Sequence, residues 1–161
     1  MIIVSDASPL INFASINHLD LLPRLFGKVV IPRRVFEEIV VHGAEMSGAE
    51  QVKNADWIEV KDCSNTSLIL ALQIQLDPGE ATAIALALEL SADVILMDER
   101  LGRRVAKEFH LNVTGSLGLL RDAKMQGLIP TVKPLVDELI AKTGFRISSQ
   151  LYEEVLQSVG E

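Results

Sequence analysis

Short apolar runs alternate along the chain with longer stretches in which apolar residues recur at helical spacing. The apolar runs predict strands at residues 2–4, 29–31, 57–60, 94–97 and 111–113. The helical spacing predicts helices at residues 8–17, 19–26, 33–42, 50–55, 68–75, 80–90, 101–109, 116–126, 132–143 and 150–158, and residues 43–48 are expected to be a loop. This alternation indicates an α/β fold, a three-layer α/β/α sandwich with a mainly parallel central sheet.

The composition is that of one globular unit. The 161 residues are 48% hydrophobic but only 4% aromatic, so a core of Leu, Ile, Val and Ala is expected. We expect a single domain over residues 1–161, with residues 130–161 as a C-terminal helical extension. No apolar run approaches the roughly 20 residues of a membrane span, and the start has no basic segment of the kind that begins a signal peptide. A cytoplasmic protein without membrane contact is therefore expected. A single cysteine excludes an intramolecular disulfide and a zinc site built on cysteines.

Two of the predicted strands end in acidic residues. Asp6 follows the first strand, and Asp98 and Glu99 follow the fourth. Ligands of open parallel sheets bind beyond the carboxyl ends of the strands. If the two strands are neighbours, these carboxylates share one edge of the sheet. Either acid alone can equally be a helix cap or a surface residue.

Two further acidic positions lie at the start or on the face of a helix. The run Asp77-Pro78-Gly79-Glu80 has the form of a capping box, with Asp77 as the N-cap. In the helix at residues 33–42, Glu37 and Glu38 lie at similar angles from the apolar face, so periodicity does not choose between them.

Four motifs occur in order: DASPL at residues 6–10, IPRRVFEEI at 31–39, PGEATAIALA at 78–87 and LMDER at 96–100. In this order and spacing the sequence resembles the PIN domain, particularly VapC-like proteins, from residue 1 to about Leu128. The resemblance implies a catalytic acid at each motif: Asp6, Glu38, Glu80 and Asp98. It thereby favours Glu38 over Glu37. It also assigns a site role to Ser8, which on local chemistry could instead cap the helix that follows.

The sequence departs from the usual VapC-like pattern in two places. The third acid is a Glu rather than an Asp, and Met97-Asp98-Glu99-Arg100 replaces a Thr or Ser followed by a spaced acid. This leaves open whether Asp98, Glu99 or both face the site.

Convergent carboxylates repel one another and require a cation. Ligands that are all oxygen suit Mg²⁺ or Mn²⁺ better than zinc, and the three histidines are too scattered for a zinc motif. The expected metal ligands are Asp6, Glu80, Asp98 and Glu99. Such an ion activates water for attack on a phosphodiester, so the sequence predicts a metal-dependent endoribonuclease.

The net charge of −7 argues against a wide nucleic-acid-binding face. The helix after the fourth acid nevertheless carries basic residues at i, i+3, i+4 and i+7: Arg100, Arg103, Arg104 and Lys107. We expect Ser8, Arg100, Arg103 and Arg104 to contact the substrate, although a basic stripe of this kind can also be a solvated helix face. Arg33, Arg34, Arg121 and Lys124 are weaker candidates.

Other interpretations remain at this point. A catalytically weak or inactive PIN-like module could act through RNA or protein contacts. A phosphatase with a nucleophilic aspartate should carry a second acid two residues after Asp6, where Ser8 stands. A receiver should carry paired acids at the end of its first strand. By resemblance, the partners are an RNA substrate, an antitoxin that restrains a toxin, and a second copy in a homodimer.

Overall fold

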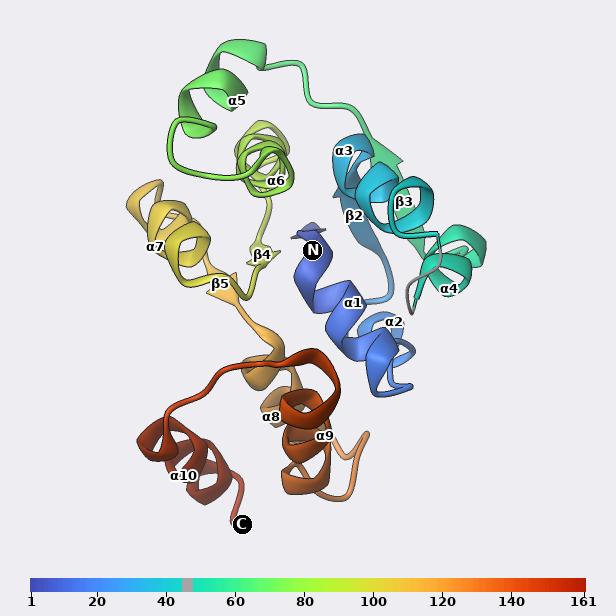
Figure 1. Cartoon of the computed structure of the whole chain (residues 1–161), viewed down its shortest axis with the longest axis vertical. Coiled ribbons are helices and arrows are strands. Elements are labelled where there is room, and N and C mark those ends of the chain that lie inside the picture. Colours follow the sequence, from blue (N-terminus) through green and yellow to red (C-terminus); the bar gives the residue numbers. More distant parts are fainter. Residues whose placement is uncertain (45–47) are drawn as a thin grey trace.

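Five parallel strands form the centre of the molecule. The computed structural model describes residues 1–44 and 48–161. In it the sheet has the order β3-β2-β1-β4-β5, and every pairing is parallel. The strands are β1 (Ile3–Ser5), β2 (Val29–Pro32), β3 (Ile58–Lys61), β4 (Val94–Leu96) and β5 (Val113–Thr114). With the helices that flank this sheet (Figure 1), the expected α/β/α sandwich is confirmed.

The helices lie where helical spacing predicts them, with ends that shift by a few residues. They are α1 (Ala7–Ser15), α2 (Leu21–Phe26), α3 (Arg33–Phe36), the π-helix η1 (Glu37–Val41), α4 (Ala49–Asn54), α5 (Thr66–Leu72), α6 (Pro78–Glu89), α7 (Arg100–Glu108), α8 (Ser116–Met125), α9 (Lys133–Thr143) and α10 (Ser149–Ser158). Of the expected loop at 43–48, residues 45–47 lie outside the described residues. Within the described ranges, no helix has both the length and the apolar character needed to cross a bilayer.

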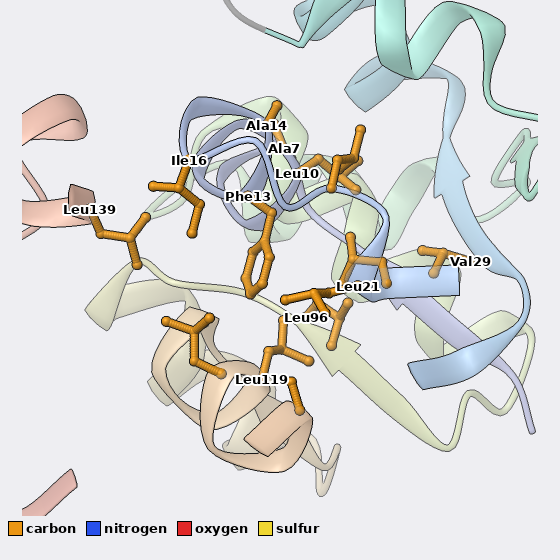
Figure 2. Packing of buried hydrophobic residues seen from close by; sticks show 14 of the residues in the cluster. Ala7, Leu10, Phe13, Ala14, Ile16, Leu21, Val29, Leu96, Leu119 and Leu139 are labelled. Carbon is orange, nitrogen blue, oxygen red and sulfur yellow. The ribbon is translucent and has the colours of Figure 1, made fainter. Parts of the chain in front are cut away.

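Apolar residues fill both faces of the sheet. On one face, Phe13 of α1 packs in a cluster that includes Leu96 of β4, Leu119 of α8 and Leu139 of α9 (Figure 2). On the other face, the small side chains of α6 allow that helix to be buried over most of its length, next to Ile95. Because α8, α9 and α10 contribute to the same cluster as α1, the C-terminal helices are packed into the main core on this face of the sheet.

The first helix begins earlier than expected. It starts at Ala7 with Asp6 at the N-cap, so of the two roles left open for Ser8 the helix cap is wrong. Pro9 is the third residue of the helix. This position costs no hydrogen bond, because the first N–H groups of any helix have no partner within it. The correction leaves the Ser8 hydroxyl outside the cap.

The helix expected at residues 33–42 is divided. After one α-helical turn it widens into η1, in which the N–H of His42 donates to the carbonyl of Glu37 at 2.9 Å. A 3.6-residue period cannot represent the extra residue of a π turn, and such turns occur frequently at functional sites. The widened turn contains Glu38.

The order of the strands places the two acidic strand ends together. β1 and β4 are neighbours, with Ser5 opposite Leu96, and the N–H of Asp6 donates to the Leu96 carbonyl at 2.9 Å. The chain moves to β2 on one side of β1 and later to β4 on the other, which makes this the switch point of the sheet. Crevices at switch points are where open α/β sheets bind ligands.

Candidate active site

Asp6 is the buried centre of an acidic cluster. Its side chain is only 3% exposed, and it makes no capping hydrogen bond although it stands at the N-cap of α1. The pKa of Asp6 is raised to about 8, and burial is the main cause. The charges of Asp77, Glu80 and Glu38 contribute to this increase, and a backbone hydrogen bond from Ala7 opposes it. Three other acids are therefore close enough to disfavour a negative charge on Asp6.

Glu80 belongs both to this cluster and to a helix cap. Its N–H donates to Asp77 Oδ1 at 2.8 Å, and its Oε1 accepts from the N–H of Asp77 at 3.1 Å, which is the expected capping box. Glu80 is 7% exposed, and burial is the main cause that raises its pKa to about 7. Glu99 adds to this effect. The capping box thus fixes Glu80 in the cluster instead of removing it.

Asp77 is a member of the cluster that sequence reasoning treated as a cap alone. Its charge raises the pKa of Asp6, Glu80 and Glu38. The available signal was the capping box itself, since the N-cap and the third helical residue lie side by side.

Glu38 reaches the cluster from η1. Burial and the charge of Asp77 raise its pKa, and Arg34, 3.7 Å away, opposes the shift. Both of its carboxylate oxygens lie 2.6 Å from the point that a Cβ on Gly79 would occupy. The absence of a side chain at Gly79 is therefore what admits the Glu38 carboxylate against the start of α6. Of the pair that periodicity left open, Glu38 is the residue in contact with α6.

Asp98 is held on the other side of the same sheet edge. Its Oδ1 accepts from the N–H of Ser116 at 2.7 Å, and its Oδ2 accepts from the Ser116 hydroxyl at 2.6 Å and from the amide of Asn12 at 2.7 Å. Ser116 is fully buried and Asn12 nearly so. Sequence reasoning missed both, because a lone Ser or Asn gives no signal without the fold. Asp98 is thus tied to α8 and α1, while Glu99 is the neighbour whose charge acts on Glu80.

The basic stripe of α7 divides in the structure. Arg100 is exposed and lines a hollow with Ser8, Asn12 and Asp98. Arg103 is half-buried and donates to the Met97 carbonyl at 3.1 Å.

Arg104 is not among the residues that line this hollow, and it pairs with Glu108 at 3.8 Å. A Cβ on Gly115 would collide with the Arg103 guanidinium, so this glycine makes the inward position of Arg103 possible. Arg100 and Ser8 are placed beside the acids, and Arg104 is not.

The donor chemistry of the cluster fits a divalent cation. Asp6, Glu38 and Glu80 present only oxygen, and each has a raised pKa that a cation would relieve. Among residues 1–44 and 48–161, no three His, Cys, Asp or Glu side chains are arranged as a closed metal-binding set. The fit therefore rests on the chemistry and mutual repulsion of the acids.

Comparisons with known proteins agree with this arrangement. A protein-family model described as a PIN domain matches residues 2–161, which includes the C-terminal helices beyond the four motifs. No curated protein matches the sequence. PIN domains are typically nucleases and usually use divalent metal ions. Because the model covers nearly the entire chain, the protein belongs to the PIN domain family.

Proposed function

We propose that this PIN domain is an endoribonuclease that depends on Mg²⁺ or Mn²⁺. The observation that carries the proposal is the buried Asp6 carboxylate, which has Glu38, Asp77 and Glu80 around it at the switch point of the sheet. Arg34 offsets part of the charge of Glu38, but four convergent acids remain costly to keep ionised, and a divalent cation removes that cost.

Asp6, Glu38 and Glu80 would hold the cation, with Asp98 and Glu99 at the neighbouring strand end. When bound, a divalent cation lowers the pKa of water and stabilises the charge that develops on a phosphodiester. The chain's own contribution is to hold and orient the reacting groups. The capping box fixes the Glu80 carboxylate in the cluster, where it can hold the cation and orient the attacking water.

The substrate contacts proposed at the site are Ser8 and Arg100. Both line the hollow that contains Asp98 and Glu99, and the Ser8 hydroxyl does not cap α1. A hydroxyl and a guanidinium beside a carboxylate site are suited to hold a phosphate next to the hydrolysed bond.

The test is cleavage of a labelled RNA that contains a hairpin and single-stranded arms, in Mg²⁺, Mn²⁺ or EDTA. We expect cleavage only with metal, and a loss of at least about a hundredfold in Asp6→Asn and in Glu38→Gln. Glu37→Gln is the matched control, because it removes the same charge one residue away and should cleave like the wild type. Cleavage in EDTA, or an unchanged rate in Asp6→Asn, would refute the proposal.

A PIN-like binding module is the second candidate, and one observation favours it. Both oxygens of Asp98 accept hydrogen bonds from Asn12 or Ser116, which leaves fewer lone pairs for coordination of a metal. Folded protein, free of any copurified partner, that binds the RNA but leaves it intact under every condition would establish this alternative.

The resemblance to VapC-like proteins supports a wider proposal, in which the enzyme is a cytoplasmic toxin restrained by an antitoxin and works as a homodimer. Growth arrest on expression of the wild type, relieved by Asp6→Asn, would support the toxin role. Light scattering of the purified protein measures the oligomeric state. Normal growth with active enzyme would refute the toxin role and leave the nuclease proposal intact.

A further inference from the structure

Two hollows meet at Asp98. The larger has a volume of about 1040 Å³ and contains Ser8, Asn12, Glu99 and Arg100. The smaller, of about 400 Å³, extends along α8 and the carboxyl end of β5. Both are also lined by Phe145 and Arg146, which lie in the connection between α9 and α10 (Figure 1). Residues 145 and 146 therefore stand at the junction of the two hollows, beside the proposed active site.

Arginines from three elements gather at the smaller hollow. Arg103 comes from α7, Arg121 from α8 and Arg146 from the α9–α10 connection. Arg121 has a half-exposed partner in its neighbour Asp122, 3.5 Å away, and no ion pair with Arg146 is found in the part of the chain that the structure describes. Exposed pairs of this kind contribute little and are easily exchanged for a phosphate.

The described lining of this hollow contains one acid, Asp98, whose oxygens already accept hydrogen bonds from Asn12 and Ser116. The hollow is therefore locally basic in a chain whose net charge is −7. The charge balance that argues against nucleic-acid binding overall does not hold here.

Apolar side chains line the same hollow as these cations. Phe145 is half-buried, Leu151 of α10 is 43% exposed, and Val113, Leu117 and Val155 also belong to the lining. A duplex presents phosphates to a protein surface and keeps its bases stacked inside. A single strand presents bases as well, and these can stack on an aromatic ring or pack on an aliphatic surface.

We propose that the smaller hollow is a subsite for single-stranded RNA, in which Arg121 and Arg146 bind backbone phosphates away from the cleaved bond and Phe145 contacts a base. The strand continues past Asp98 into the larger hollow, where Arg100 and Ser8 face the acids. This inference rests on the proposed nuclease function and adds residues of the C-terminal segment to the substrate path.

The experiment measures binding apart from cleavage. The Asp6→Asn protein in EDTA is titrated with a labelled single-stranded RNA over a range of KCl concentrations, alone and with Arg121→Gln, Arg146→Gln or both. Each substitution should weaken binding several-fold and reduce the salt slope by about 0.7, the value for one phosphate contact of a single strand. Arg24→Gln is the control, because this exposed arginine of α2 lies outside both hollows and its loss removes the same charge.

Two further arms test the strand and the base contact. Phe145→Leu should weaken binding of the single strand without a change in salt slope, because it removes a stacking surface and no charge. A duplex RNA of equal length should bind more weakly than the single strand and should not respond to Phe145→Leu.

The outcomes separate this inference from the proposed function. If the wild type cleaves RNA but Arg121→Gln and Arg146→Gln bind like Arg24→Gln, the subsite is wrong and the nuclease proposal stands. If binding depends on both arginines while the wild type cleaves nothing, the subsite stands and the nuclease proposal fails. Absence of binding by the parent protein, or tighter binding of the duplex, overturns the subsite.

Discussion

The carboxylate of Asp98 accepts hydrogen bonds from both the backbone N–H and the hydroxyl of Ser116, at 2.7 and 2.6 Å. Ser116 begins α8 and is fully buried, so Asp98 at the end of β4 is fixed to the start of the next helix. The same carboxylate receives the amide of Asn12 from α1. The orientation of Asp98 therefore depends on two neutral residues, Asn12 and Ser116, which position it through hydrogen bonds and have no proposed contact with the substrate.

Ser116→Ala tests this dependence. The substitution removes a buried hydroxyl that donates to a carboxylate, so the free energy of unfolding should fall by about 1–3 kcal/mol. If Asp98 acts at the site, RNA cleavage by the folded fraction should also fall. Asn65→Ala, which removes the N-cap of α5 away from the site, is a control that should cost about 1 kcal/mol and leave cleavage by folded protein unchanged. Equal cleavage by the two variants would show that the Ser116 hydroxyl is not needed to position Asp98 for cleavage.

Gly79→Ala tests the position of Glu38. A Cβ at this residue would lie 2.6 Å from both Glu38 carboxylate oxygens, and the flexible glutamate must then move away. Gly79 is in the first turn of α6, where Ala is a better helix former than Gly, so the Tm should stay within a few degrees of the wild type. Metal-dependent cleavage should fall by about 10- to 100-fold.

A double-mutant cycle identifies the cause of that loss. If Gly79→Ala acts through Glu38, the double variant Gly79→Ala/Glu38→Gln should cleave no more slowly than Glu38→Gln alone. Additive losses would mean that the added methyl group disturbs Asp77 or Glu80 instead.

The parts of the fold that repeat a regular period could be predicted from the sequence. The run at 94–97 is continuously apolar, and it forms β4, buried next to β1. The strand ends that precede Asp6 and Asp98 lie side by side because parallel strands end at a common edge, which requires only the knowledge that β1 and β4 are neighbours. The capping box at Asp77 and Glu80 follows from local chemistry and is present as expected.

The features of the site that depend on a local break in a regular helix, or on contacts between distant segments, could not be predicted from the sequence. The π turn at Glu38 adds one residue to a helical period, and the close approach of Glu38 to Gly79 exists only after two distant segments pack. The α7 stripe is correct in spacing, yet Arg103 turns inward because Gly115 leaves room for it. Arg146 gave no signal, since nothing in the sequence places residue 146 beside residue 98.

Glu161→Gln tests how the C-terminal helices are held. Glu161 accepts from Lys124 Nζ at 2.8 Å and from the N–H groups of Val132 and Lys133 at 2.7 and 3.1 Å. Chiefly through Lys124, these donors lower the pKa of Glu161 to about 2. The variant should lose about 1 kcal/mol at pH 7 after allowance for exposure, a fall in Tm of about 2–4 °C.

The pH dependence of this effect has a definite sign. Because the pKa of Glu161 is lowered on folding, its contribution is complete above the unfolded value near 4.5 and is lost as the pH falls toward 2. The difference in Tm between Glu161→Gln and the wild type should therefore shrink below pH 4.5. Glu153→Gln on α10 is the charge control and should show no such convergence, and a constant difference at all pH values would contradict the assignment.

The raised pKa of Asp6 predicts the opposite slope for the metal-free protein. Folding raises this pKa from 3.8 to about 8, so the folded state binds the proton more tightly than the unfolded state. Stability is therefore greatest when Asp6 is protonated in both states, and it declines as the pH rises from about 4 to 8. Thermal melts in EDTA between pH 5 and pH 8 should show a falling Tm.

A divalent cation and Asp6→Asn should each reverse this decline, for different reasons. The cation competes with the proton for the carboxylates, so Mg²⁺ or Mn²⁺ should raise the Tm more at pH 8 than at pH 6. Asp6→Asn removes the buried charge, so at pH 8 without metal its Tm should exceed that of the wild type by at least about 2–4 °C, while added metal should stabilise it little. A metal-free wild type whose Tm does not fall toward pH 8 would mean that the charge of Asp6 does not destabilise the fold. An Asp6→Asn protein that metal stabilises as much as the wild type would mean that Asp6 is not the centre of the cation site.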